Sequence, residues 1–422
     1  MFHVKHLAKL TLLLLTPALL LAQQPGFNYE EANVPTYVLP EALALDGGDR
    51  VMDEKTWTNK RRPEILDLFA THVYGRMPGA GPKPSYEVFE QSDHALDGKA
   101  SRKQVRVTFG SGDEAPWMDI LLYLPANASG ATPVFVGLNF GGNHTVRPEP
   151  EIRLSDRWMR DRGEGIVNHR ATEMTRGSAA SRWAVEEIVA HGYGVATIYC
   201  GDLDPDFDDG FENGVHRLFD KTGPDDWGTI GAWAWGLSRA LDYFETDGDV
   251  NHERVAVMGH SRLGKAALWA GAADERFAMV ISNDSGCGGA ALSRRRFGET
   301  VERINTSFPH WFAGNFKKYN DNEDGLPVDS HMLLALMAPR PVYVASALED
   351  QWADPRGEFL SAKIAGEVYE LFGKKGLGVE KMPAVEQPAM GHVGYHIRRG
   401  KHDVTDYDWA RYIDFADKHF RR

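Results

Sequence analysis

A serine on a predicted tight turn is the residue of this sequence best placed for covalent chemistry. Ser261 lies in GHSRLGK (259–265), after the strand-like run RVAVMG and before the helix-like run AALWAGA. A turn of this kind lifts the serine hydroxyl out of a sheet and leaves backbone N–H groups free to hold an oxyanion. The spacing G-x-S-x-x-G also fits an ordinary serine at the start of a helix. The strand before it and the helix after it favour a nucleophile.

A serine nucleophile needs a histidine base, and the sequence offers three late candidates. They are His392, His396 and His402. In hydrolases with this kind of turn the chain order is serine, acid, histidine. We expect His402 to be the base, because it follows a strand-like run and precedes the last helix-like segment, where a loop can carry its ring over the sheet edge. His396 would lie within that strand and His392 before it.

The carboxylate that orients the histidine has two candidate positions. Asp350 follows the penultimate strand-like run RPVYVASA, and its neighbour Glu349 is a reserve. Asp284 ends the strand-like run after the nucleophile segment, in NDSGCGG, where it can equally be a turn-forming residue. The sequence leaves the choice between Asp284 and Asp350 open.

Two cations accompany the serine. Arg262 supplies the next backbone N–H and a guanidinium that can fold over a developing oxyanion, and Lys265 lies one helical turn further on the same face. Surface side chains are the plain alternative for both. The loop NFGGNH (139–144) can close the oxyanion side with backbone N–H groups, or be a simple Gly-Gly turn. The pair of cations favours a substrate rich in hydroxyls or bearing a nascent carboxylate.

Short apolar runs that alternate with helix-length segments must position these residues. This pattern predicts an α/β fold of the α/β-hydrolase type, with a mainly parallel central sheet and helices on both faces. Active sites of such sheets gather at the carboxyl ends of the strands. We expect strands near residues 103–110, 118–125, 132–140, 193–200, 254–261, 277–286, 340–350 and 392–399, and helices near 56–75, 178–192, 228–245, 266–272 and 407–420.

The N-terminal segment indicates an exported protein, and the composition indicates one large core. The chain has 422 residues, of which 42% are hydrophobic, and no linker or repeat that would divide residues 23–422. Residues 1–22 resemble a signal peptide, which predicts a secreted or periplasmic protein, and no later segment predicts a membrane span. The net charge of −13 disfavours nucleic acid as a partner. Arg294, Arg295 and Arg296 form either a local basic pocket or, more simply, a solvated face.

No metal or other cofactor is predicted. The two cysteines, Cys200 and Cys287, lie outside any metal-ligand spacing, and no H-E-x-x-H motif occurs. Both cysteines follow strand-like runs in Gly-rich turns. In an oxidising compartment they form either one disulfide or two buried free thiols.

Four blocks in chain order resemble the bacterial glucuronoyl esterases of carbohydrate esterase family 15. They are GHSRLGK, NDSGCGGAALSRRRFGETVERINTSFPHWF, SALEDQWADP and GYHIRRGKHD followed by YDWARYIDF. The resemblance covers most of the chain after residue 22. It implies a carboxylic ester hydrolase of the 4-O-methyl-glucuronoyl methylesterase type. The implied substrate is the ester between 4-O-methylglucuronic acid of glucuronoxylan and lignin alcohols, and we expect the protein to act as a monomer.

The resemblance also assigns roles to particular residues. It implies Ser261 as nucleophile, Arg262 as oxyanion stabiliser and His402 as base, with Asp284 at the position of the fungal acid and Asp350 at an alternative bacterial one. Uronic acid contacts are implied for three residues, Lys265, Glu299 and Trp352. The sequence departs from the fungal pattern at His260, where fungal members have a disulfide-bonded cysteine, and at Glu299, where they have glutamine.

Other functions fit the same residues. The nearest is an acetyl xylan esterase or another carbohydrate esterase, because a fold does not fix its substrate. A glycan-binding protein without turnover is a second alternative, which the complete set of serine, histidine and acid disfavours. A serine peptidase fits less well, because Lys265 and Glu299 offer a donor and an acceptor for sugar hydroxyls beside the serine.

Overall fold

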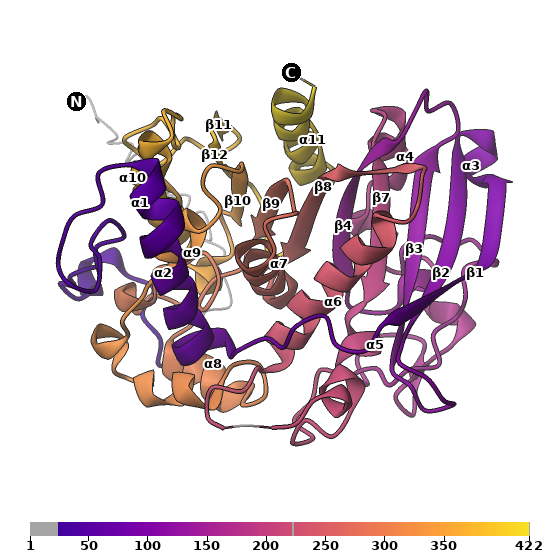
Figure 1. Ribbon diagram of the computed structural model, residues 1–422, viewed down its shortest axis with the longest axis horizontal. Helices are drawn as coiled ribbons and strands as arrows, with labels where there is room; N and C mark the ends of the chain where they lie inside the picture. Colours follow the sequence, from indigo (N-terminus) through magenta and orange to yellow (C-terminus); the bar gives the residue numbers. More distant parts are fainter. Residues whose placement is uncertain (1–23, 222, 422) are drawn as a thin grey trace, which may run out of the picture.

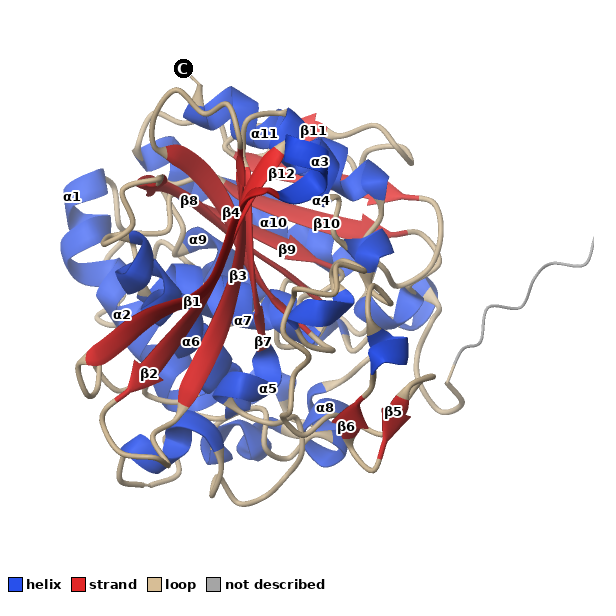
Figure 2. Ribbon diagram, turned by 90° about the vertical axis from the view of Figure 1, so that its right-hand side faces the viewer, coloured by secondary structure: helices blue, strands red, loops and turns tan. Residues whose placement is uncertain are grey.

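The computed structural model describes residues 24–221 and 223–421, so the predicted signal peptide lies outside the described residues. A twisted 10-stranded sheet forms its centre, in the order β1-β2-β3-β7-β4-β8-β9-β10-β12-β11 (Figure 2). The strands are β1 Pro84–His94, β2 Ala100–Phe109, β3 Trp117–Pro125, β4 Thr132–Asn139, β7 Gly194–Tyr199, β8 Val250–His260, β9 Met279–Asn283, β10 Val342–Ala347, β11 Ala389–Met390 and β12 Val393–Arg398.

The six strands β7, β4, β8, β9, β10 and β12 are parallel to one another, and the remaining strands extend this block with antiparallel pairings. The predicted mainly parallel sheet is therefore confirmed. Strand β1 was not among the predicted strands. It forms the edge of the sheet and most of its residues are exposed or half-buried, so its sequence carries little of the apolar pattern that marks the inner strands.

Helices cover both faces of the sheet (Figure 1). Side chains of the central strands alternate between two cores: Val136 and Val257 pack with Trp233 and Trp269, while Phe135 belongs with the aromatic residues of the last helix. The helices are α1 Glu54–Thr56, α2 Arg62–Phe69, α3 Ala95–Gly98, α4 Val185–Ala190, α5 Cys200–Leu203, α6 Thr229–Phe244, α7 Arg262–Ala273, α8 Val301–Ser307, α9 Ser330–Ala335, α10 Pro355–Leu371 and α11 Asp406–Phe420.

A long segment between β4 and α4 adds a small antiparallel hairpin, β5 Ile166–Val167 with β6 Arg170–Ala171. The predicted helix near 56–75 is a continuous helical stretch in which α1 and α2 alternate with π-helical turns at Trp57–Arg61 and Ala70–Tyr74. Across residues 24–221 and 223–421, no helix is long and apolar enough to span a membrane.

Two open questions from the sequence are answered by burial. Cys200 and Cys287 are both buried free thiols, so the disulfide alternative is wrong. Arg294 and Arg295 are buried, and their guanidiniums pair with Asp329 and Asp354. The expected solvated face, and equally the basic pocket, is therefore wrong for these two arginines, because their charges are neutralised inside the protein.

Neighbouring parallel strands end at the same edge of the sheet. β8 ends at His260, β9 at Asn283, β10 at Ala347 and β12 at Arg398. The residues predicted to do chemistry follow these four ends within one to four positions: Ser261, Asp284, Asp350 and His402. The order β8-β9-β10-β12 thus brings four distant parts of the sequence to one place.

Candidate active site

Ser261 has the backbone strain of a nucleophile turn. Its φ is 58° and its ψ is −130°, a conformation that side-chain-bearing residues seldom adopt. A Cβ on Gly259 would lie 2.0 Å from the carbonyl oxygen of Leu263, and one on Gly264 would lie 3.0 Å from that of Gly259. The two glycines therefore permit the sharp passage from β8 to α7, and Ser261 stays half-buried at its crest.

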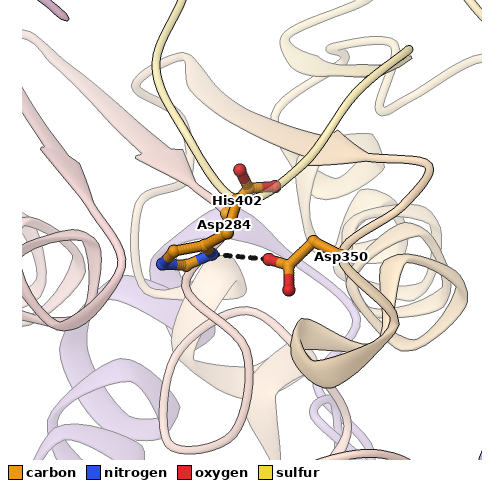
Figure 3. Close-up of side chains that lie close together, drawn as sticks. All are labelled: Asp284, Asp350 and His402. Carbon is orange, nitrogen blue, oxygen red and sulfur yellow. Dashed lines mark hydrogen bonds and ion pairs between the residues drawn. The ribbon is translucent and has the colours of Figure 1, made fainter. Parts of the chain in front are cut away.

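His402 and Asp350 form a hydrogen-bonded pair beside this turn. Nδ1 of His402 lies 2.6 Å from Oδ2 of Asp350 (Figure 3). The imidazole side chain is 41% exposed, whereas that of Asp350 is 6% exposed. The His402 ring also packs on the ring of His260, the neighbour of Ser261, with 4.4 Å between centroids. A buried carboxylate thus holds one ring nitrogen of His402, while part of the imidazole remains exposed to solvent.

Asp284 lies close to the same pair but has a different partner. Single ligand atoms of Asp284, Asp350 and His402 lie within 4.8 Å of one another (Figure 3). Oδ2 of Asp284 is 3.4 Å from Nη2 of Arg398. Burial, followed by the charge of Asp350, raises the pKa of Asp284 well above its ordinary value. The reserve acid Glu349 is exposed to solvent.

The two other late histidines have contacts outside the pair formed by His402 and Asp350. His396 is buried within β12, where its Nε2 is 2.9 Å from Asp408 and its Nδ1 is 2.9 Å from the Tyr343 hydroxyl. His392 precedes the strand and packs against the ring of His419. Their places relative to the strand agree with the prediction, whereas His402 follows the strand and pairs with Asp350.

Arg262 is fixed by a residue that the sequence did not single out. Its Nε lies 2.8 Å from Oδ2 of Asp206, and its guanidinium stacks 4.6 Å from the Phe140 ring centroid. Burial opposes ionisation of Asp206, but a hydrogen bond from His310 and the nearby guanidiniums outweigh it and lower the pKa of Asp206. Asp206 stands among many aspartates in DLDPDFDDG, so nothing in the sequence marked it.

Lys265, Glu299 and Trp352 come together on α7 and the loops beside it. Nζ of Lys265 donates to the carbonyl oxygen of Ser285 at 2.5 Å and lies 3.9 Å from Oε2 of Glu299. The backbone N–H of Glu299 donates to the carbonyl of Trp352. Burial lowers the pKa of Lys265 and raises that of Glu299, and each group's charge partly offsets the shift of the other. This cluster offers a donor, an acceptor and an aromatic face.

A cavity of about 280 Å³ adjoins the turn on the side of Arg262. The long segment between β4 and α4 supplies much of its wall, beginning with Phe140 and Gly141 of the loop 139–144 that was expected to close the oxyanion side. The later part of this segment was not among the predicted site residues. Its lining combines aromatic and aliphatic side chains with several guanidiniums; it includes Phe140, Trp158, Met159, Ile166, Trp183, Met258, Val404, Arg160, Arg162, Arg182, Asp206, His260 and Arg262. Such a lining fits a planar apolar group with polar substituents.

Comparisons with known proteins show which family this chain belongs to. Residues 203–373 match the family model for glucuronyl esterases of fungi. A carbohydrate esterase from an unknown prokaryotic organism is 55% identical over 404 residues, which cover 94% of this chain and 93% of that protein. The solved structure of a promiscuous family 15 esterase from a marine bacterial metagenome has 54% identity and a TM-score of 0.88, covering 93% of this chain and all of that one.

The chain belongs to carbohydrate esterase family 15. This esterase is therefore a carboxylic ester hydrolase with the α/β-hydrolase fold, as the sequence predicted. A glucuronoyl esterase structure from Solibacter usitatus is also 54% identical, with a TM-score of 0.88 over 92% of this chain and all of that one. A protein of Podospora anserina named 4-O-methyl-glucuronoyl methylesterase is 32% identical over 79% of this chain and 60% of its own.

His260 has a structural role in this esterase, at the position where fungal relatives were expected to have a disulfide-bonded cysteine. Its Nδ1 lies 2.6 Å from Oδ1 of Asn283, and its ring supports that of His402. Burial lowers the pKa of His260 well below its ordinary value, so the ring is neutral. A neutral, hydrogen-bonded ring can pack on His402 without repelling a positive charge there.

Proposed function

We propose that this esterase hydrolyses the ester between 4-O-methylglucuronic acid of glucuronoxylan and lignin alcohols. The observation that carries the proposal is the His402–Asp350 pair beside the strained Ser261 turn, with the Lys265–Glu299 pair one helical turn away. The relatives named 4-O-methyl-glucuronoyl methylesterase support the acid part of the substrate.

In the proposed mechanism Ser261 attacks the ester carbonyl while Nε2 of His402 takes the hydroxyl proton. Asp350 holds Nδ1–H and stabilises the imidazolium. The Arg262 guanidinium and backbone N–H groups of the turn bind the oxyanion. His402 then protonates the departing alcohol, and the same base activates a water molecule that releases the uronic acid from Ser261.

The two sides of the turn suit the two halves of this ester. We assign the uronic acid to the side of Lys265, Glu299 and Trp352, where sugar hydroxyls find a donor and an acceptor and the ring finds an aromatic face. The alcohol then extends toward the cavity lined by Trp158 and Trp183. A lignin-type alcohol is planar and bears polar substituents, which matches this lining.

We also propose that residues 23–422 are one catalytic domain that is exported to the periplasm or the medium and acts as a monomer. The basis is that the turns and loops with the proposed catalytic residues follow strands of one continuous sheet, and that one chain supplies them. The segment 1–22, with the composition of a signal peptide, is the basis for export.

A comparison of esters tests the proposal. We expect kcat/KM for benzyl glucuronate to exceed that for an acetylated xylo-oligosaccharide, because acetate cannot engage Lys265 and Glu299. The reverse order would favour an acetyl xylan esterase. Ser261→Ala should abolish turnover of both esters while circular dichroism shows an unchanged fold, and substantial turnover in this variant would refute the mechanism.

A further inference from the structure

We propose that Arg398 is the positioning residue for the histidine base, and that Asp284 acts on the reaction through Arg398 rather than through the imidazole. This inference rests on the proposed function, in which His402 is the base. The inference assigns different roles to Asp284 and Asp350, the two acids between which the sequence left the choice open.

The guanidinium of Arg398 holds the loop on both sides of His402. Nη1 donates to the carbonyl oxygens of Arg399 and Lys401, each at 3.0 Å, and Nη2 donates to that of Asp403. Arg398 is the last residue of β12 and is buried. Its side chain therefore fixes the path of the chain immediately before and after the base.

The remaining contacts of the guanidinium anchor it to the rest of the site. Nε donates to Oδ2 of Asp408 at 2.7 Å, and Nη2 lies 3.4 Å from Oδ2 of Asp284. Asp408 also accepts from the backbone N–H and the hydroxyl of Thr405, so it ties the loop to the start of α11. A guanidinium has five N–H donors in a rigid fork, and this geometry uses all five.

His402 depends on its loop because its own side chain is poorly enclosed. The imidazole is 41% exposed, and its hydrogen bond to Asp350 fixes one nitrogen only. Backbone bonds from Leu348 to Arg398 and from Glu349 to Gly400 link the end of β10 to the same loop. If the loop shifts, the ring leaves Asp350, and a displacement of about 1 Å can cost on the order of a hundredfold in rate.

Asp284 is suited to holding Arg398 and poorly suited to sharing the charge of an imidazolium. It is buried, and its raised pKa means that it carries its proton more readily than an ordinary aspartate. A protonated aspartate resembles asparagine in shape and still offers an oxygen to Nη2 of Arg398. We therefore expect asparagine to replace Asp284 but not Asp350.

Arg398→Lys is the direct test, with Arg340→Lys as its matched control. Arg340 likewise donates to backbone carbonyls, those of Phe277 and Gly271, but far from His402 in sequence and on another loop. With benzyl glucuronate we expect kcat of Arg398→Lys to fall on the order of a hundredfold while KM changes little, since only the base moves. Arg340→Lys should keep kcat even if it unfolds at a lower temperature.

A proton NMR signal separates positioning from general stability. The Nδ1–H of His402 in its 2.6 Å bond to Asp350 should give a far-downfield resonance. We expect Arg398→Lys to lose this signal and Arg340→Lys to retain it. A wild-type kcat or an intact downfield signal in folded Arg398→Lys would overturn the proposal.

The aspartate variants keep the proposal testable if Arg398→Lys does not fold. Asp284→Asn should retain most of kcat, whereas Asp284→Ala should lose it. Where Arg398→Lys does fold, its combination with Asp284→Ala should be no slower than Arg398→Lys alone. Equal losses in Asp284→Asn and Asp284→Ala, or multiplied losses in the double variant, would contradict it. Failure of the proposed function is seen separately, as activity remaining in Ser261→Ala.

Discussion

His402 and Asp350 lie 52 positions apart in the sequence, yet Nδ1 of one is 2.6 Å from Oδ2 of the other. They follow the ends of β12 and β10, which are adjacent and parallel. In the register of these strands, Val342 lies opposite Val393 and Ala347 lies opposite Arg398. The two loops therefore begin at the same edge of the sheet. This pairing supports Asp350 as the proposed acid that orients His402.

We expect Asp350→Asn to lower kcat by a factor on the order of 10²–10⁴, because asparagine cannot stabilise the imidazolium and favours the wrong tautomer. Initial rates on benzyl glucuronate measure the effect. Glu349→Gln is the control, since that neighbouring side chain is exposed and should leave kcat unchanged. A larger loss in Glu349→Gln than in Asp350→Asn would reverse the assignment.

Arg262→Ala should lower kcat on the order of 10²–10³, as removal of one oxyanion donor does elsewhere. Arg254→Ala is a suitable control, because Arg254 is an exposed cation in the first half of β8, the strand that precedes Ser261. Single-turnover kinetics would locate the loss in the acylation step. If both variants slow equally, the guanidinium of Arg262 contributes only to the overall charge of the surface.

Lys265→Met should weaken the use of glucuronate esters more than that of acetate esters, because only the former present sugar hydroxyls to Nζ. We expect kcat/KM for benzyl glucuronate to fall about tenfold, which corresponds to about 1.4 kcal/mol, with little change for a simple acetate ester. Lys363→Met, at a lysine on α10 that pairs with Glu380, is the control. Equal losses on both esters would argue against a sugar contact.

Glu358 should make the stability of the protein depend on pH. Burial, together with the charges of Asp350 and Asp354, raises the pKa of Glu358 from 4.5 to about 8, against hydrogen bonds from Ser346 and Gly286 that lower it. Between these two values the folded state holds a proton that the unfolded state releases. The contribution of Glu358 to the free energy of unfolding is therefore fully present below pH 4.5 and is lost as the pH rises toward 8. The free energy of unfolding falls by up to about 1.4 kcal/mol per pH unit in this range.

Glu358→Gln removes this ionisation while keeping the shape of the side chain. We expect its unfolding free energy, from urea titrations at pH 5 and pH 8, to fall less with pH than that of the wild type. Glu367→Gln serves as a control on the same helix, since Glu367 is a less deeply buried acid. Parallel pH dependence in Glu358→Gln and the wild type would contradict a buried, proton-holding Glu358.

The sequence by itself determined the parallel sheet and the place of the nucleophile turn. Runs of apolar residues mark strands that are buried on both faces, and Gly259 and Gly264 mark the passage that only glycine permits around Ser261. The four ordered blocks were enough to identify the family. These features are local, because each depends on residues close together in the chain.

Tertiary structure decided which distant side chains meet. Asp284 and Asp350 follow strand ends of the same kind, so only their positions in space assign the first to Arg398 and the second to His402. The pairing of Arg262 with Asp206 likewise joins residues that are distant in the chain. Hydrogen bonds and ion pairs between loops depend on strand order and register, and neither quantity is written in the local pattern of the residues that form them.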